Sequence, residues 1–231
     1  MSLSRVSIAA VAFVVVTFLT APSAKAGNFS FVGTFTQDDN VQLFNFTLST
    51  SAIVTFRTYS YAGGTNANGM TILRGGFDPN LALFNSTTTF LLIQNDNGVG
   101  VATDPATSRA WDSLQTINLP AGNYTLALTE SNNFAVGPSL TNGFTRQGQG
   151  NFTASRDARC LSGQFVDASN VFPGDCRNGN WAVDILNVTS AQQVGGATPV
   201  PEPASILLMI SGFAGIALKI RRRHMNGSKS R

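Results

Sequence analysis

The side chains that most often carry catalysis or bind metals are scarce in this chain. Its only histidine is His224, near the carboxyl end, so residues 27–199 contain no Ser-His-Asp triad, no Cys-His pair and no imidazole ligand for a metal. A glycosidase would need two carboxyl groups facing one cleft, yet Glu130 is the only glutamate between residues 27 and 199. No spacing of aspartates singles out a pair. We therefore predict that the protein is not an enzyme and uses no cofactor.

Acidic loops offer a different chemistry, the binding of a hard cation. Ca²⁺ takes roughly six to eight oxygen ligands, which Asp and Asn side chains in loops can supply. The candidates are Asp38, Asp39, Asp78 and Asp96, with neighbouring amide oxygens. No EF-hand spacing or glycine-aspartate repeat accompanies them, and Asp or Asn in loops more often caps turns. Turn capping is the preferred interpretation, and calcium binding is the alternative.

Two cysteines, Cys160 and Cys176, lie in a segment rich in Gly, Asn and Asp. In an exported protein the oxidising surroundings favour a disulfide between them. Closing a loop of this length would stabilise the fold by about 3 kcal/mol in the chain-entropy model. A metal site is the alternative, but two thiols without a nearby histidine do not complete a tetrahedral shell. We predict the disulfide.

Charge is distributed unevenly along the chain. The formal net charge is +3, yet residues 27–199 hold eleven acidic and seven basic side chains, a net charge of −4 for that region. The excess of positive charge therefore lies at the two ends. Because residues 27–199 form no basic stripe that could neutralise a phosphate backbone, we do not expect nucleic acid as a partner.

The amino-terminal segment resembles a signal peptide. Arg5 precedes an apolar run at residues 8–19, and Ala24 and Ala26 flank Lys25 in the small-x-small pattern that signal peptidase accepts. A core helix is the alternative, but the apolar run is shorter than the ~20 residues that span a bilayer and suits a signal sequence. We predict a signal peptide at residues 1–26.

The carboxyl-terminal segment combines an apolar stretch with basic residues. Residues 204–220 would form a helix of about 26 Å, slightly shorter than the ~30 Å of a hydrocarbon core. A buried helix of a soluble domain should show a polar face, and apart from Lys219 near its end only Ser and Gly interrupt this one. The basic residues Arg221, Arg222 and Arg223 follow at once, and such clusters stay on the cytoplasmic side. We predict a transmembrane helix at residues 204–220.

The residues before this helix have their own signature, Val200, Pro201, Glu202 and Pro203. The prolines fix φ and hold the segment extended beside the membrane. This motif, the apolar helix and the terminal arginines together resemble the PEP-CTERM sorting signal of Gram-negative bacteria. The resemblance implies that an exosortase, a membrane-embedded enzyme with a catalytic cysteine, processes the tail. It also implies an association with exopolysaccharide and biofilm, and it makes this chain a substrate rather than an enzyme.

Residues 27 to about 187 show the period-two alternation of β-strands. Gly and Asn pairs separate the alternating stretches, and no long amphipathic helix pattern intervenes. We therefore predict an all-β, antiparallel β-sandwich. The alternating stretches are FSFVGTF (29–35), LFNFTL (43–48), AIVTFRTY (52–59), NYTLALTE (123–130) and WAVDILNV (181–188).

Three further stretches resemble a family of exported bacterial β-sandwich proteins built on an FDP motif. They are GGFDPNLALFN (75–85), IQNDNG (93–98) and WDSLQTINLPAGNYTLALTESNNF (111–134). That family is similar to the pre-peptidase C-terminal domain, so the resemblance implies a jelly-roll-like sandwich. Residues 134–176 look like an insertion that the family pattern does not describe.

The residues of these motifs also have purely structural interpretations. In the FDP motif we expect Phe77 in the core, Asp78 accepting hydrogen bonds from backbone amides and Pro79 opening a turn. In LPAGNY we expect Pro120 at a strand end and Gly122 with the positive φ of a tight hairpin.

Two non-catalytic roles remain for the folded region. It is either a structural component of the surface or matrix, or a polysaccharide-binding module that stacks sugars on exposed aromatics. The candidate platforms are Tyr59, Tyr61 and Trp111. We favour core positions for these side chains, and hence the structural role.

The predicted precursor has four parts. They are the signal peptide 1–26, the sandwich 27–188 with its insertion at 134–176, a linker 189–199, and the sorting tail 200–231. We expect the precursor in the inner membrane with its body in the periplasm and its carboxyl end in the cytoplasm, and the mature protein at the cell surface or outside. The expected partners are signal peptidase, exosortase, the inner membrane and exopolysaccharide.

Overall fold

A computed structural model describes residues 25–167 and 176–195. The predicted sorting tail, including Val200 to Pro203, the arginines 221–223 and the helix 204–220, lies outside the described residues, as does the predicted signal peptide except for its last two residues. Within the part of the chain that is described, no helix is long and apolar enough to cross a membrane.

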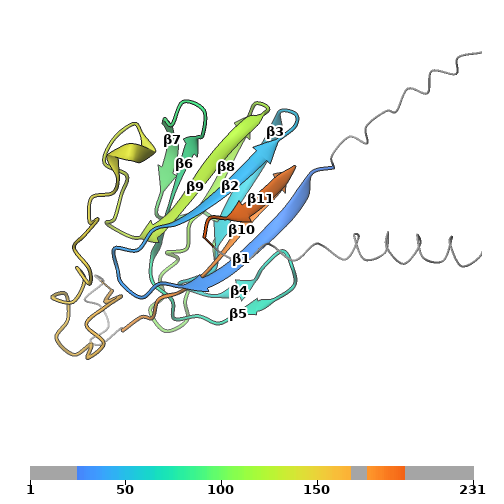
Figure 1. Ribbon diagram of the computed structural model, residues 1–231. Helices are drawn as coiled ribbons and strands as arrows, with labels where there is room; N and C mark the ends of the chain where they lie inside the picture. Colours follow the sequence, from blue (N-terminus) through green and yellow to red (C-terminus); the bar gives the residue numbers. More distant parts are fainter. Residues whose placement is uncertain (1–24, 168–175, 196–231) are drawn as a thin grey trace, which may run out of the picture.

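The described chain is built from antiparallel strands in two main sheets (Figure 1). The first sheet has the order β1 (Gly27–Thr34), β10 (Asn180–Val188), β3 (Ala52–Thr58) and β8 (Leu114–Leu119). The second has the order β11 (Ser190–Gln193), β2 (Gln42–Leu48), β9 (Gly122–Glu130), β6 (Pro79–Asn85) and β7 (Leu91–Asn95). A small ribbon, β4 (Gly64–Thr65) and β5 (Thr71–Ile72), and one 3-10 turn, η1 (Leu140–Asn142), lie outside these sheets.

Successive strands of the two main sheets change from one sheet to the other, except at β6 and β7, which are neighbours in the second sheet. If the ribbon and the edge strand β11 are set aside, the remaining eight strands can be numbered one to eight along the chain. The sheet orders then become 1-8-3-6 and 2-7-4-5, the double Greek key of a jelly roll. The predicted all-β, antiparallel sandwich is the observed architecture.

The core between the sheets follows from the alternation of side chains along each strand. Phe44 and Phe46 of the second sheet are buried, and so are Val183 and Ile185 of the first. The rings of Phe44 and Trp181 form a T-shaped pair with centroids 5.7 Å apart. Gly33 pairs with Trp181 across the first sheet, and a Cβ at Gly33 would overlap the Trp181 ring.

The second sheet is covered on its outer face as well. Every residue of β6 except the last is buried, as expected for a strand that packs on both faces. Ala82 and Phe84 point away from the main core and pack with Phe144 in a separate cluster. The segment after β9 therefore folds back over the second sheet.

Two local expectations about turns are wrong. The Pro120 link does not form a hairpin, because β8 pairs with β3 in the first sheet while β9 pairs with β2 and β6 in the second. Gly122 is the first residue of β9 and is not among the glycines with positive φ. The hydroxyl of Tyr124 donates to the Pro120 carbonyl over 2.8 Å and holds this crossing between the sheets.

The boundary of the sandwich also differs from the prediction. Residues 189–199 were expected to form a linker, but Ser190–Gln193 form β11 and pair with β2. Ala191 is the buried residue of this strand. A single small apolar side chain among Ser and Gln gives almost no alternation, which explains why the strand is hard to recognise in the sequence.

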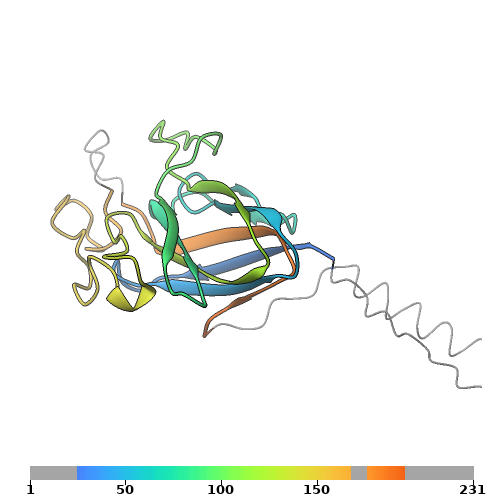
Figure 2. The same ribbon diagram turned by 90° about the horizontal axis from the view of Figure 1, so that it is seen from above.

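The segment between β9 and β10 lies at one end of the sandwich. Its described residues, up to 167 and from 176, include one 3-10 turn and no named strand; they contain the predicted insertion and are called the inserted segment below. The disulfide predicted between Cys160 and Cys176 is present here. Figures 1 and 2 show this segment, coloured yellow to orange, at the end opposite to the beginning of β1.

Candidate functional site

A polar pocket of about 220 Å³ lies at the end of the sandwich where this segment packs. Antiparallel pairing explains its position, because the start of one strand lies beside the end of its neighbour. Pro79 at the start of β6 pairs with Glu130 at the end of β9. The pocket is lined by Phe77, Asp78, Asn97, Trp111, Glu130, Ser131, Asn132, Arg156, Phe165, Val166, Asp167 and Arg177.

One side of the pocket is aromatic. Phe77 stacks on Phe165 with ring centroids 5.4 Å apart, and on Phe35 with centroids 5.1 Å apart. This stack joins the inserted segment to the core of the sandwich. Trp111 is half-buried, and Arg109 lies 5.3 Å from the centroid of its ring. The pocket thus presents carbon surface beside its polar groups.

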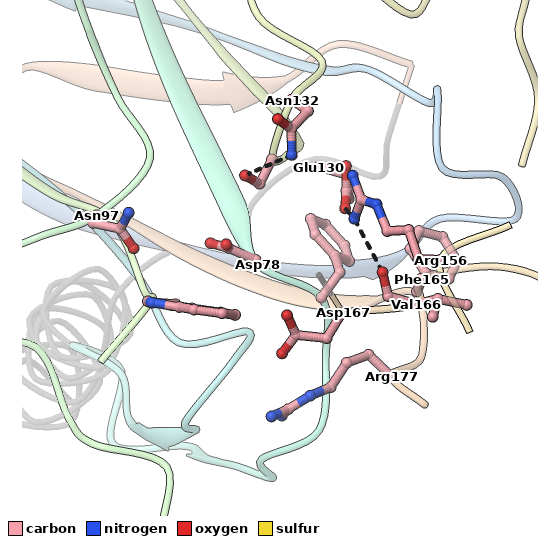
Figure 3. A pocket seen from close by; sticks show the side chains of 12 residues that line it. Asp78, Asn97, Glu130, Asn132, Arg156, Phe165, Val166, Asp167 and Arg177 are labelled. Carbon is pink, nitrogen blue, oxygen red and sulfur yellow. Dashed lines mark hydrogen bonds and ion pairs between the residues drawn. The ribbon is translucent and has the colours of Figure 1, made fainter. Parts of the chain in front are cut away.

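Three carboxyl groups from three different segments line the same space: Asp78 before β6, Glu130 at the end of β9, and Asp167 from the inserted segment (Figure 3). In the described structure, Asp78 Oδ1 and Glu130 Oε2 are buried and have no hydrogen-bond partner. Buried polar atoms usually have partners, so these two oxygens are exceptions that call for an explanation.

The expectations for the FDP motif are therefore met only in part. Phe77 is in the core with 1% of its surface exposed. Asp78, expected to accept from backbone amides, instead leaves Oδ1 without a partner in the described structure. Pro79 does not open a turn but begins β6, a position where the missing N–H of proline costs no ladder hydrogen bond.

Burial changes the ionisation of two of these acids. Desolvation raises the pKa of Asp78 well above its usual value, and the negative charges of Asp96 and Glu130 raise it further. Desolvation also raises the pKa of Glu130 to about 8, although the charge of Arg156 acts in the opposite direction. Both carboxyl groups thus hold a proton more strongly than an exposed acid does.

The two arginines of the pocket are bound to the protein itself. Arg156 Nη1 donates to Glu130 Oε1 over 3.1 Å and to the Val166 carbonyl over 3.0 Å. Arg177 Nη1 donates to Asp104 Oδ2 over 2.9 Å, and its guanidinium lies 3.7 Å from the centroid of the Tyr61 ring. Both guanidinium groups therefore already serve the fold.

Asp167 is connected to the wall behind the pocket. The hydroxyl of Tyr61 donates to Asp167 Oδ2 over 2.6 Å and contacts Thr107 Oγ1 at 3.1 Å. Burial, together with the hydrogen bond to Asp167, raises the pKa of Tyr61. Tyr61 therefore remains a neutral donor and fixes the position of the Asp167 carboxyl group.

The four calcium candidates are not gathered into one site. Asp38 accepts hydrogen bonds from the amides of Thr153 and Phe165, which is a structural role. Asp39 accepts from the Gly150 amide over 2.9 Å. Of the four, only Asp78 lines the pocket. Among the described residues, no group of three or more His, Cys, Asp or Glu side chains is placed to hold a metal ion.

The three aromatic candidates also separate. Tyr59 is buried, and its hydroxyl donates to Asp184 Oδ2 over 2.8 Å. Tyr61 is fully buried behind the pocket. These two side chains occupy core positions, as favoured from the sequence. Trp111 alone lines the pocket.

A second pocket, of about 330 Å³, lies beneath the segment after β9. Val41, Leu43, Leu140 and Phe144 supply its apolar surface. None of its described lining residues is titratable, so the polar pocket is the better candidate for recognition.

Comparison with known proteins bears on the carboxyl-terminal tail. A model of the PEP-CTERM protein-sorting motif matches residues 199–223. The chain thus carries the tail of an exported protein that an exosortase processes, as its resemblance implied. No curated protein matches the chain.

Several pocket residues have no recognisable signal in the sequence. Asp167, Arg156 and Arg177 stand in loops without regular spacing. The sequence does draw attention to Glu130, because it is the only glutamate of residues 27–199 and the last residue of an alternating stretch. That observation identifies an unusual residue but not the carboxyl groups that lie beside it.

Proposed function

We propose that this protein is an exported, non-catalytic structural component of the cell surface or extracellular matrix, associated with exopolysaccharide. The match to the sorting motif at residues 199–223 is the observation that carries the proposal. In this view signal peptidase removes residues 1–26, and exosortase acts at the tail. Residues 204–220 hold the precursor in the inner membrane, with the sandwich in the periplasm and Arg221–Arg223 in the cytoplasm.

The sandwich supports a role in a harsh extracellular setting. It has a large aromatic core, and a disulfide ties the inserted segment to the residues just before β10. Such a disulfide persists in oxidising compartments.

The intact mass of the mature protein from its native host tests the sorting proposal. We expect loss of residues 1–26 and a cut near Glu202, with any added mass showing attachment to a carrier. A variant with alanine at Pro201, Glu202 and Pro203 should accumulate with its tail intact. A control with alanine at Gly195, Gly196 and Thr198, just before the matched residues, should be processed normally. A soluble cytosolic chain that retains both ends would contradict the proposal.

A second candidate function is a polysaccharide-binding adhesion module. The polar pocket favours it, because Trp111 places an aromatic ring beside carboxyl and amide groups, the combination that binds and orients sugar rings. Binding of the host exopolysaccharide that is lost in Trp111→Ala, while the variant remains folded, would support this role. The same assay tests the non-catalytic assignment, since turnover of the polysaccharide that Asp78→Asn abolishes would show an enzyme.

A further inference from the structure

The polar pocket is lined by three carboxyl groups but only two guanidinium groups among its described residues. Arg156 and Arg177 are bonded to Glu130 and Asp104, and Asp78 has no such partner among the described residues. The charges that act most strongly on Asp78 are all negative; they belong to Asp96, Glu130, Asp167 and Asp112.

Two buried oxygens point to a missing donor. Glu130 has only 3% of its surface exposed, yet its Oε2 atom has no partner in the described structure. Asp78 Oδ1 is in the same condition. Leaving a buried acceptor unpaired costs roughly 1–3 kcal/mol, and more when it is charged. A ligand that brings N–H donors and a positive charge would satisfy both oxygens.

The shape and lining of the pocket narrow the class of cation. Ca²⁺ needs roughly six to eight converging oxygen ligands. Among the described residues, no cluster of three or more His, Cys, Asp or Glu side chains is placed to hold a metal ion. A protonated amine instead donates three hydrogen bonds in divergent directions. Carbon atoms attached to the amine would meet Trp111, Phe165 and Val166, and an aromatic ring also attracts an organic cation through its π face.

We propose that this pocket binds the protonated amine of a small ligand, with Asp78 and Glu130 as its counter-charges and Trp111 against its carbon skeleton. The volume of about 220 Å³ lies below the ~300–1,000 Å³ of pockets for drug-sized ligands, so one sugar ring or one short alkyl chain fits. Two sources supply this chemistry, an amino sugar of a polysaccharide or a simple alkyl amine. The inference deepens the adhesion candidate and does not depend on sorting.

Calorimetric titration of the full chain in non-ionic detergent tests the proposal, in a buffer without amines. The probes are glucosamine, glucose and n-butylamine. We expect glucosamine to bind at least about tenfold more tightly than glucose, because a charged hydrogen bond is stronger than a neutral one. Asp78→Asn should weaken amine binding by roughly tenfold or more. Asp157→Asn removes an acid paired with Arg159 outside the pocket and should leave the affinity unchanged.

Glu130 supplies a second, independent readout. Its neighbours in the pocket region are Arg156, Asp38, Asp167 and Asp78. Because the amine needs the ionised carboxyl group, n-butylamine should bind more tightly at pH 8.5 than at pH 6, by roughly tenfold or more. Glu130→Gln should remove most of this pH dependence. The glutamine keeps an oxygen that can accept from Arg156, and the folding of the variant is checked before the titration.

The outcomes separate this inference from the adhesion role. If glucose binds as tightly as glucosamine, the amine inference fails and the adhesion candidate stands. If n-butylamine binds as well as glucosamine, the amine inference stands and the sugar is not the determinant. If none of the probes binds, or if Asp78→Asn leaves amine binding unchanged, the inference is overturned. Tighter binding of Ca²⁺ that Asp78→Asn abolishes would also overturn it.

Discussion

The described structure contains buried acids of two kinds. Acids of the first kind each accept hydrogen bonds from at least three donor atoms; they are Asp38, Asp104, Asp112 and Asp184. Asp78 and Glu130 each keep an oxygen without a partner in the described structure. The first kind orders loops around the strand ends. The second kind leaves buried oxygens without partners beside a pocket, at a cost to the stability of the fold.

The largest effect should come from removing a satisfied acid. Asp104 is fully buried and pairs with Arg74 and with Arg177, whose side chain is 2% exposed. Burial alone would raise the pKa of Asp104, but the hydrogen bonds from the two arginines lower it below its usual value. Asp104→Ala should destabilise the protein by roughly 3–5 kcal/mol, because it removes the carboxylate that balances the charge of the buried Arg177.

Urea unfolding of the full chain in non-ionic detergent measures this change. Asp157→Ala is the matched control, since its partner Arg159 is 58% exposed, and it should change stability by about 1 kcal/mol or less. A loss below about 1 kcal/mol for Asp104→Ala would remove the distinction between the two kinds of acid.

The pH dependence of stability should reveal the unsatisfied acid. The pKa of Glu130 is about 8 in the folded protein and 4.5 as its ordinary value, so between these values the folded state holds a proton that the unfolded state has lost. Stability from this group is complete below about pH 4.5 and is lost as pH rises through about 8, at up to about 1.4 kcal/mol per pH unit.

Glu130→Gln provides the reference for that measurement. The free energy of unfolding of the wild type, minus that of Glu130→Gln, should fall as pH rises from 5 to 8. Other titrating groups affect both proteins alike and cancel in the difference. Parallel curves for the two proteins would show that Glu130 ionises as an exposed acid does.

Replacing Asp by Asn should change the stability of the protein in opposite directions at the two kinds of acid. Asp112 accepts from the Tyr61 and Ala62 amides and from the Thr58 hydroxyl, so Asp112→Asn should destabilise by roughly 1–3 kcal/mol. Burial raises the pKa of Asp78, so folding near pH 8 costs free energy whether the buried carboxyl group stays ionised or takes up a proton. Asp78→Asn removes that cost without breaking a described hydrogen bond and should stabilise by about 1 kcal/mol. Thermal unfolding at that pH compares them, and destabilisation by both would show that Asp78 also has a structural role.

The sequence predicted those parts of the fold whose signal is local. Strands β1, β2, β3, β9 and β10 all contain alternating stretches, because each has one face in the core. The strand β11 was assigned to a linker because Ala191 is its only buried residue. The hairpin expected at Pro120 is instead a crossing between sheets, and no local pattern tells which sheet the next strand will join.

The candidate site was predictable only in fragments. The sequence singles out Asp78, but as a turn residue or a cation ligand. It also singles out Trp111, but as a stacking platform or a core residue. Glu130 lies 52 residues beyond Asp78 in the chain, and the register that pairs Pro79 with Glu130 brings them together. Register arises from the packing of whole sheets, so short sequence patterns do not specify it.

The sequence by itself determined the β class of the body and the sorting tail. Both depend on residues that are contiguous in the chain: a strand face repeats every second residue, and the sorting motif matches the single stretch 199–223. Only the tertiary structure decided which acids are satisfied and which line the pocket. Burial, hydrogen-bond partners and the distance between charges set the state of a carboxyl group, and these arise when segments distant in the chain pack against one another.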